Sequence, residues 1–246
     1  MIVGFVGSGS MAAAIARGWV GEFEQMLFSD SGSGRAGELA SELGGEAVSN
    51  EEIARRADLV ILAVKPNKLE EVAPALVGAK EIVSVLAVVP LERLRAAFPG
   101  AEHVLRVMPN VGVEVRSGVL CVAGSAGAEA RAKLELLGHV VEIPDSEFDE
   151  ATAIMGCTPA YLALAVEALA DAGAAAGLDP DLARELVVET TAGTAELLRS
   201  RHPADVRKAV ASPGGSTEVG LEALDREGAR RAFEAAVEAS LERMRG

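Results

Sequence analysis

Two glycine-rich segments carry the residue types best suited to binding chemistry in this sequence. The first reads Gly7-Ser8-Gly9-Ser10-Met11-Ala12 and follows the apolar run Ile2–Val6, so it matches G-x-G-x-x-A between a strand and a helix. In that pattern the first glycine makes a tight turn, the second lets a pyrophosphate approach, and the third small residue allows close helix–sheet packing. The N–H groups of the helix start face the phosphates, and the context favours binding over a merely structural turn. The predicted dinucleotide contacts are Gly7, Ser8, Gly9, Ser10 and Met11.

The segment after the second expected strand offers groups for either form of the coenzyme. It reads Phe28-Ser29-Asp30-Ser31-Gly32-Ser33-Gly34-Arg35. An acidic side chain such as Asp30 would hold the 2′-hydroxyl of NAD, whereas hydroxyls together with Arg35 would hold the 2′-phosphate of NADP. Both coenzymes stay open, with NADPH preferred over NADH, and a flexible solvated loop is the alternative. The candidate contacts are Ser29, Asp30, Ser31 and Arg35.

The second glycine-rich segment could hold a small anion. It reads Ala211-Ser212-Pro213-Gly214-Gly215-Ser216-Thr217-Glu218 and precedes a helical pattern that runs from Val219 to Glu227. Backbone N–H groups at such a helix start suit a carboxylate or a phosphate. The alternative is an ordinary loop between helices in which Ser216 or Thr217 is the N-cap, and the residue types leave both interpretations open.

The elements around these segments predict a two-part chain. Short apolar runs alternate with helical patterns up to residue 143, which is typical of βαβ units and a mostly parallel sheet. The expected strands are Ile2–Val6, Gln25–Phe28, Leu59–Val64, Ile82–Val85, His103–Val107, Gly118–Val122 and Val140–Ile143. Helical periodicity follows at 147–155, 159–176, 180–200, 203–210, 217–227 and 229–245. We therefore predict an α/β protein: a Rossmann-like, doubly wound, mostly parallel sheet in residues 1–145, then an all-α dimerisation domain in residues 146–246.

Composition and charge narrow the classes of function. Of 246 residues, 50% are hydrophobic, 24% charged and 3% aromatic, which excludes disordered and collagen-like proteins and leaves few rings for stacking on nucleic acid. With 37 acidic and 23 basic residues the net charge is −14, so nucleic acid and anionic membranes are poor partners. A helical part of about 100 residues is small for burying its own apolar faces. We therefore expect a homodimer or an oligomer of dimers.

Cysteine and hydropathy patterns predict a cytoplasmic protein that holds no metal. Cys121 and Cys157 lack C-x-x-C spacing, and with three scattered histidines they form no zinc pattern. The longest uncharged runs, Met1–Ala16 and Ala151–Val166, have sixteen residues each and contain glycine. We therefore expect no membrane span and no signal peptide.

Several motifs occur in an order that is typical of one family. They are Gly4–Met11, Ala63–Pro66, Arg106–Asn110, Gly156–Tyr161, Glu167–Asp171 and Ser212–Thr217, of which the last is the most specific. Through them the chain resembles the pyrroline-5-carboxylate reductases over nearly its whole length. The resemblance implies a first domain that binds NADPH or NADH and a helical domain that dimerises and completes the partner's active site. It also implies hydride transfer to the imine carbon of 1-pyrroline-5-carboxylate, which gives L-proline in the last step of proline biosynthesis.

The resemblance implies roles for particular residues. Asn50 and the turn Val64-Lys65-Pro66 would border the coenzyme, and Met108-Pro109-Asn110 would line its nicotinamide side. The substrate carboxylate would be held by Ser212, Gly214, Gly215, Ser216 and Thr217. Thr217 would also hydrogen-bond the ring nitrogen as the catalytic residue, because imine reduction needs positioning and a polar group at nitrogen more than a strong acid.

This sequence departs from the family pattern at three places. Leu86-Ala87-Val88 stands where the family usually has Ala-Ala-Gly, Val111-Gly112 where it has Thr-Pro, and Cys157-Thr158 where small Ser or Gly residues are common. The bulkier Leu86 and Val88 are expected to narrow the pocket near the nicotinamide. Two alternatives therefore stay open. One is an enzyme that acts on another small imine or keto acid, and the other is a coenzyme-binding protein without turnover.

A relative of the β-hydroxyacid dehydrogenases is the other enzyme alternative. Those enzymes use a lysine in the first long helix of the second domain, whereas this chain has no lysine between Lys133 and Lys208. Glu167 and Asp171 lie one helical turn apart, and we interpret them as interhelical or dimer contacts.

Overall fold

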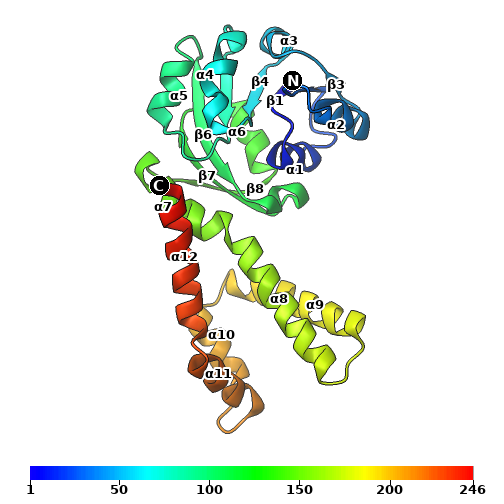
Figure 1. Cartoon of the computed structure of the whole chain (residues 1–246), viewed down its shortest axis with the longest axis vertical. Helices are drawn as coiled ribbons and strands as arrows, with labels where there is room; N and C mark the ends of the chain where they lie inside the picture. The colour runs from blue at the N-terminus through cyan, green and yellow to red at the C-terminus, as the bar shows by residue number, and fades with distance from the viewer. Residues whose placement is uncertain (246) are drawn as a thin grey trace. The chain divides into compact units, whose positions relative to one another are not determined.

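The chain folds into two compact units, the first of which is built on one sheet. The computed structural model describes residues 1–245, divided into Met1–Cys157 and the residues from Thr158 onward (Figure 1). The first unit contains one sheet in the order β3-β2-β1-β4-β5-β6-β7-β8. Its strands are β1 (Ile2–Val6), β2 (Gln25–Ser29), β3 (Glu46–Ala47), β4 (Leu59–Leu62), β5 (Glu81–Ser84), β6 (His103–Pro109), β7 (Gly118–Gly124) and β8 (Gly138–Glu142). Neighbours are parallel except for β6 and β7, which confirms the prediction of a mostly parallel sheet.

The strand that the sequence pattern did not predict is β3. It has two residues, Glu46 and Ala47, and both are exposed. A strand this short at the edge of a sheet carries no apolar periodicity, so no sequence signal marks it. The other strands occur where the apolar runs predict them.

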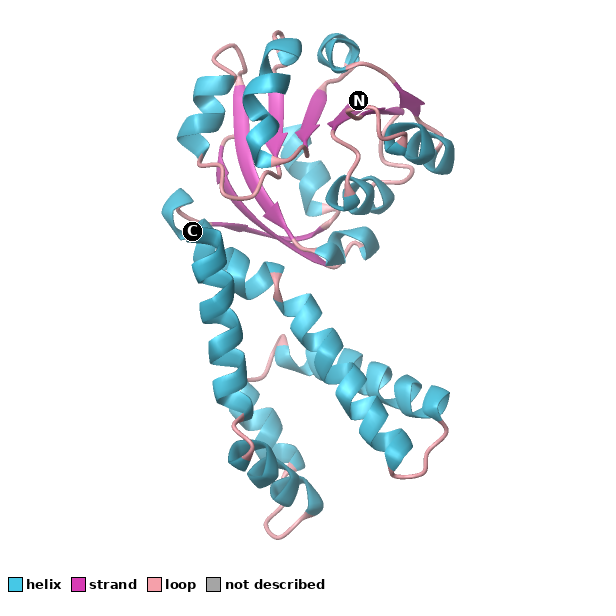
Figure 2. Cartoon of the chain, in the orientation of Figure 1, coloured by secondary structure: helices cyan, strands magenta, loops and turns pink. Residues whose placement is uncertain are grey.

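Helices cover both faces of the sheet (Figure 2). They are α1 (Ser10–Gly18), α2 (Arg35–Leu43), α3 (Asn50–Arg56), α4 (Leu69–Val72), α5 (Leu91–Ala97) and α6 (Ala128–Glu135). In β4, Leu59 and Ile61 pack in the core that contains α1 and α2. Val60 and Leu62, on the opposite face, pack with side chains of α3, α4 and α5. A strand buried on both faces has to be apolar at every position, as this one is.

A helical segment after the sheet also packs on the first unit. It comprises α7 (Phe148–Ala151) and a π-helical turn, Thr152–Gly156. Phe148 is 1% exposed and packs with Met108 of β6 and Cys121 of β7. By packing, this segment belongs to the first compact unit, although its composition resembles that of the helices that follow.

The described part of the second unit contains helices joined by short turns and no strand. Its helices are α8 (Thr158–Ala175), α9 (Pro180–Leu198), α10 (Pro203–Val210), α11 (Ser216–Arg226) and α12 (Ala229–Arg245). Asp179 caps α9 by accepting backbone N–H groups of its first turn, and His202 caps α10 through Nδ1. The prediction of an all-α second part is confirmed.

This helical unit buries little of its own apolar surface. Among its described residues, Ala183 is the one that is fully buried. Leu162 and Leu169 of α8 are 50% and 61% exposed, and Leu186 of α9 is 50% exposed. With their neighbours they line an apolar groove, hereafter the α8–α9 groove, formed by Leu162, Leu169, Leu186, Val187, Thr190, Thr191, Thr194, Ala195 and Leu198.

The apolar character extends along the chain in front of α8. By length and composition the helical stretch Asp145–Ala175 could cross a membrane, and 6% of its most apolar window is buried within the chain. An exposed apolar face of this size is also typical of a protein–protein interface.

Candidate active site

The first glycine-rich segment forms a tight turn at the end of β1. Gly7 has φ +97°, and a Cβ atom there would lie 2.6 Å from the carbonyl oxygen of Ala63, so only glycine fits. Its N–H donates to the carbonyl of Ser29 at 3.1 Å. Around Gly9, by contrast, no atom lies within 4 Å of the place where a Cβ would be. The turn is therefore held tightly on one side and is open on the other.

The start of α1 presents backbone donors beside this open surface. Gly9 is the N-cap with extended backbone, and the first helical hydrogen bond runs from Ala13 N to Gly9 O at 3.0 Å. The N–H groups of Ser10, Met11 and Ala12 precede that bond and have no partner within the helix. Ala12 itself is completely buried, as close packing on the sheet requires. This cradle fits the pyrophosphate of a dinucleotide.

The turn lies where the strand order reverses. β1 has β2 on one side and β4 on the other, so the chain leaves the sheet in opposite directions at the carboxyl ends of β1 and β4. Dinucleotides bind in the crevice that such a reversal opens. The turn that starts at Ala63 and Val64 lies against Gly7, and Lys65 beyond it is exposed. The structure thus brings the predicted Val64-Lys65-Pro66 turn to the glycine-rich segment.

The loop after β2 differs from the expectation in the direction of two side chains. Ser29 is 3% exposed, and its hydroxyl donates to Asn50 Oδ1 at 2.6 Å instead of facing the loop surface. The Asp30 carboxylate accepts four hydrogen bonds from its own loop and from the start of α2, including those from the N–H groups of Gly32 (2.6 Å) and Ala36 (2.8 Å). The Ala36 N–H is the main cause that lowers the pKa of Asp30. Both side chains hold the loop in place, and their role as ligand groups stays a prediction.

Among the exposed side chains of the loop after β2 are one basic group and one hydroxyl. Ser31 and Arg35 are exposed. An open hollow lies beside them, lined by Asp30, Gly32, Gly34, Ala36, Gly37, Ala47, Val48 and Ser49. Ser8 is buried and donates to the carbonyl of Ser29 at 3.0 Å, so its side chain also holds the scaffold. Asn50 lies next to the end of β2, because its Oδ1 accepts the hydrogen bond from the Ser29 hydroxyl.

The side chain of Asn110 holds the end of β6 in place. Asn110 Oδ1 accepts the N–H groups of Gly112 and Val119, and its Nδ2 donates to the carbonyl of Met155 at 3.2 Å. Asn110 therefore ties β6 to β7 and to the π-helical turn, and Met108 is buried under Phe148. Both side chains pack within the protein, and the lining of the nicotinamide side by these residues stays a prediction.

Sequence reasoning missed the role of a buried arginine. Arg106 of β6 is 4% exposed, and its Nη1 lies 2.9 Å from Asp145 Oδ1. Its guanidinium lies 4.1 Å from the ring centroid of Phe148, a cation–π contact. Asp145 Oδ2 in turn accepts the N–H of Leu91, the first residue of α5. The signal available in the sequence was an arginine inside an apolar strand, because a charge at such a position needs a partner.

The second glycine-rich segment forms a turn that exposes the start of α11. The N–H of Gly215 donates to Ser212 O at 2.9 Å, and Gly214 has φ +73°, which with Pro213 before it is typical of a type II turn. A Cβ on Gly215 would lie 2.7 Å from Ser212 Oγ. The backbone conformation therefore favours glycine at position 214, and a side chain at position 215 would crowd Ser212.

Hydroxyls and backbone donors gather at this helix start. The N-cap is Gly215, and the first helical bond runs from Val219 N to Gly215 O, so the alternative in which Ser216 or Thr217 is the N-cap is wrong. Ser216 and Thr217 are exposed, and the N–H groups of the first turn have no partner within the helix. Glu218 bends back to accept the N–H of Gly214 at 2.7 Å. The arrangement can hold a carboxylate and place a hydroxyl beside it.

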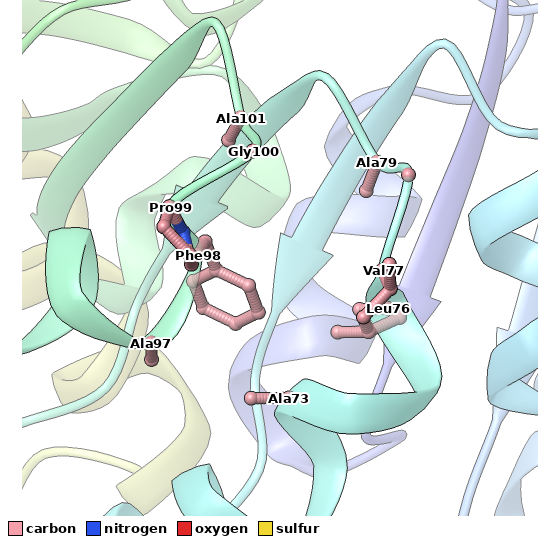
Figure 3. A pocket seen from close by; sticks show the side chains of 10 residues that line it. Ala73, Leu76, Val77, Ala79, Ala97, Phe98, Pro99, Gly100 and Ala101 are labelled. Carbon is pink, nitrogen blue, oxygen red and sulfur yellow. The ribbon is translucent and has the colours of Figure 1, made fainter.

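A small hollow at the other end of the sheet has a different character (Figure 3). It has a volume of about 90 Å³ and lies where β5 and β6 begin, whereas the glycine-rich turn lies where β1 and β4 end. Its lining is apolar: Ala73, Leu76, Val77, Gly78, Ala79, Ala97, Phe98, Pro99, Gly100 and Ala101. Without a polar side chain it is not suited to a charged substrate.

Comparison with known proteins identifies the family. A family model described as "Pyrroline-5-carboxylate reductase dimerisation" matches residues 145–246, and one described as "NADP oxidoreductase coenzyme F420-dependent" matches residues 2–88. The pyrroline-5-carboxylate reductase of Synechocystis sp. is 35% identical, with 98% of this chain and 96% of that protein covered. The chain belongs to the pyrroline-5-carboxylate reductase family. The resemblance carried by its motifs is confirmed, and the β-hydroxyacid dehydrogenase alternative falls away.

Solved structures agree with this family. The structure of a 1-pyrroline-5-carboxylate reductase from Streptococcus pyogenes is 32% identical and matches with a TM-score of 0.87 over 99% of this chain and 98% of its own. The Plasmodium falciparum pyrroline carboxylate reductase, solved with NADP bound, is 27% identical with a TM-score of 0.84 over 99% and 97%. The predicted fold class is confirmed over both units.

Residues that depart from the pyrroline-5-carboxylate reductase pattern lie in different environments. Leu86 is 1% exposed in the core, whereas Val88 is 47% exposed and has φ +55°. Val111, 53% exposed, begins a 3-10 turn.

Glu167 and Asp171, which we interpret as interhelical or dimer contacts, are exposed on α8. They lie within the region that the dimerisation model matches.

Proposed function

We propose that this protein reduces 1-pyrroline-5-carboxylate to L-proline with NADPH as the hydride source. The observation that carries the proposal is a pair of glycine-capped helix starts, those of α1 and α11, in a chain that matches pyrroline-5-carboxylate reductases over 98% of its length. One start suits a pyrophosphate and the other a small carboxylate. We assign the coenzyme to residues 1–145 and the substrate carboxylate and dimerisation to residues 146–246.

In the first part, backbone groups do most of the binding. We propose that the N–H groups of Ser10 and Met11 hold the pyrophosphate while Gly7 and Gly9 keep the approach free of side chains. Ser8, Asn50 and the Val64-Lys65-Pro66 turn shape this crevice. On the nicotinamide side the contribution of Met108, Pro109 and Asn110 is to fix the end of β6.

The loop after β2 supports NADPH over NADH. The Asp30 carboxylate is used by four hydrogen bonds of its own loop, so it does not offer free acceptors to a ribose 2′-hydroxyl. Ser31 and Arg35 stay exposed there and suit a 2′-phosphate. NADH is the alternative coenzyme, and the same assay measures both.

The second part supplies the substrate site. When bound, the coenzyme supplies a hydride to the imine carbon, and a proton completes the secondary amine at nitrogen. Ser212, Gly214, Gly215 and Ser216 hold the carboxylate at the start of α11. The Thr217 hydroxyl, one residue into the helix, hydrogen-bonds the ring nitrogen and orients the imine. Positioning of this kind is the main requirement of the reaction, because no strong acid is needed.

We propose a homodimer, or an oligomer of dimers, in the cytoplasm. The exposed α8–α9 groove and the match of residues 145–246 to a dimerisation model support the association. The stretch Asp145–Ala175 then places its apolar residues against protein instead of lipid. Cys121 and Cys157 are free thiols, which suits a reducing compartment.

The test is to follow oxidation of NADPH and of NADH by the purified protein with 1-pyrroline-5-carboxylate. We expect turnover with both, with a higher kcat/KM for NADPH, and proline as the product. Tight coenzyme binding without turnover of the pyrroline would show a binding protein and overturn the proposal.

A further inference from the structure

Val88, in the loop between β5 and α5, adopts a backbone conformation that its side chain disfavours. It has φ +55°, and a β-branched residue in the left-handed region is an outlier. In the described chain one other non-glycine residue, Arg116, has a positive φ. The guanidinium of Arg116 donates to the carbonyls of Gly18 and Val20, so its conformation gains contacts. Val88 is 47% exposed and belongs to neither core of the sheet.

The loop around Val88 is fixed at both ends, so the strain cannot relax. Leu86 is 1% exposed and Val89 is completely buried. Further on, the N–H of Leu91 donates to the Asp145 carboxylate at 3.1 Å. A glycine at this position would remove the strain. Strained positions that persist in a fixed framework cluster at ligand sites. The strain at Val88 therefore indicates a ligand site nearby.

Val88 lies at the same edge of the sheet as the glycine-rich turn. The ends of β1, β4 and β5 form one row, in which Val6 pairs with Leu62 and Leu62 pairs with Ser84. Gly7 follows the first of these residues, and Val88 follows the last by four positions. The loop after β2, which suits the adenosine ribose, is on the far side of β1. A dinucleotide that crosses the reversal between β1 and β4 therefore extends its nicotinamide half toward β5.

We infer that Val88 is a specificity-determining residue that limits the ring size of the imine substrate. This inference rests on the proposed function. Its isopropyl group occupies space beside the nicotinamide that a glycine would leave open, and a planar five-membered ring needs less room there than a six-membered one. The wall of a pocket can discriminate between two substrates that differ by one methylene group, with an effect of about tenfold or more on kcat/KM.

The experiment compares Val88→Ala and Val88→Gly with the unchanged protein on 1-pyrroline-5-carboxylate and on its six-membered homologue, 1-piperideine-6-carboxylate, each with NADPH. We expect the ratio of the two kcat/KM values to fall by about tenfold in both variants, because both remove the isopropyl group. Val88→Ala keeps a Cβ at positive φ, so it separates loss of bulk from relief of strain. Val77→Ala is the matched control: Val77 is 82% exposed, has φ −60° and lies before β5, at the other end of the sheet.

The outcomes separate the inference from the function on which it rests. Turnover of the pyrroline by the unchanged protein, with the same ratio in both Val88 variants as in the Val77 control, overturns the role of Val88 alone. Equal gains on both substrates overturn it too, because they indicate access instead of selection. No turnover of the pyrroline by the unchanged protein overturns the proposed function and this role together.

Discussion

The two units of the chain differ in how they bury their apolar residues. In the first, the sheet has a core on each face, and side chains such as Phe5, Ile61 and Leu62 are at most 1% exposed. In the second, Ala183 is the fully buried residue of the described part, while leucines of α8 and α9 are half exposed. A unit with its own core can fold alone, whereas helices with open apolar faces need a partner. The first unit thus has a core of its own, whereas the open apolar faces of the second support the proposed association.

The variant with the largest expected effect tests this dependence directly. Leu169→Asp places a carboxylate in the α8–α9 groove. An unpaired buried carboxylate costs several kcal/mol, so self-association should weaken about a thousandfold, which is roughly 4 kcal/mol, and turnover should be lost. Sedimentation velocity measures the association, and fluorescence titration should show that NADPH still binds to the first unit.

The matched control is Val77→Asp, because Val77 is exposed on the first unit. It should leave both association and NADPH affinity unchanged. A Leu169→Asp protein that sediments as the unchanged protein does would show that the groove is not where copies meet.

The next prediction concerns the internal stability of the first unit. Asp145→Ala removes the partner of Arg106, whose side chain is 5% exposed, and leaves a buried charge unpaired. We expect a loss of about 3 kcal/mol in the free energy of unfolding of this unit. Urea unfolding followed by circular dichroism measures it.

An exposed ion pair provides the comparison. Glu102→Ala breaks the 3.4 Å pair with Lys80, in which both side chains are more than 60% exposed. Its effect should stay within about 0.5 kcal/mol. Equal losses in the two variants would contradict a special role for the buried pair.

A smaller effect, confined to catalysis, is expected in the second unit. Thr217→Ala removes the hydroxyl proposed at the ring nitrogen but leaves the N-cap, Gly215, in place. We expect kcat/KM for the pyrroline to fall about tenfold, the value of one hydrogen bond, with the Kd for NADPH unchanged. Thr217→Ser should retain most of the activity. A parallel loss of NADPH affinity would mean that Thr217 belongs to the coenzyme site.

The smallest effect depends on pH and lies in the first unit. Hydrogen bonds from the loop, above all from the N–H of Ala36, lower the pKa of Asp30 below its usual 3.8. The stability that Asp30 contributes is therefore present above that usual value and is lost as the pH falls through the lowered pKa. Asp30→Ala should cost about 1 kcal/mol at pH 7. The difference between the two proteins in thermal unfolding should shrink at low pH, and a constant difference would contradict this.

The sequence predicted the framework better than the directions of polar side chains. The uninterrupted apolar run of β4 and the glycines of the two turns follow from local geometry, so the sequence pattern was enough to predict them. The partners of Ser29, Arg106 and Asn110 lie 21, 39 and 45 residues away in the chain. Such bonds depend on the finished fold, and nothing near these residues in the sequence shows whether they face a ligand or the protein.

The short strand β3 has a consequence for how the protein associates. Open sheet edges present unpaired backbone groups that can pair with another chain and lead to aggregation. At one edge, β3 offers two residues, and Glu46 is held in an ion pair with Arg56. At the other edge, β8 ends in Glu142, which pairs with Arg131. Brevity at one edge and charge at both disfavour sheet-to-sheet growth, which leaves the proposed contacts between copies to the helices.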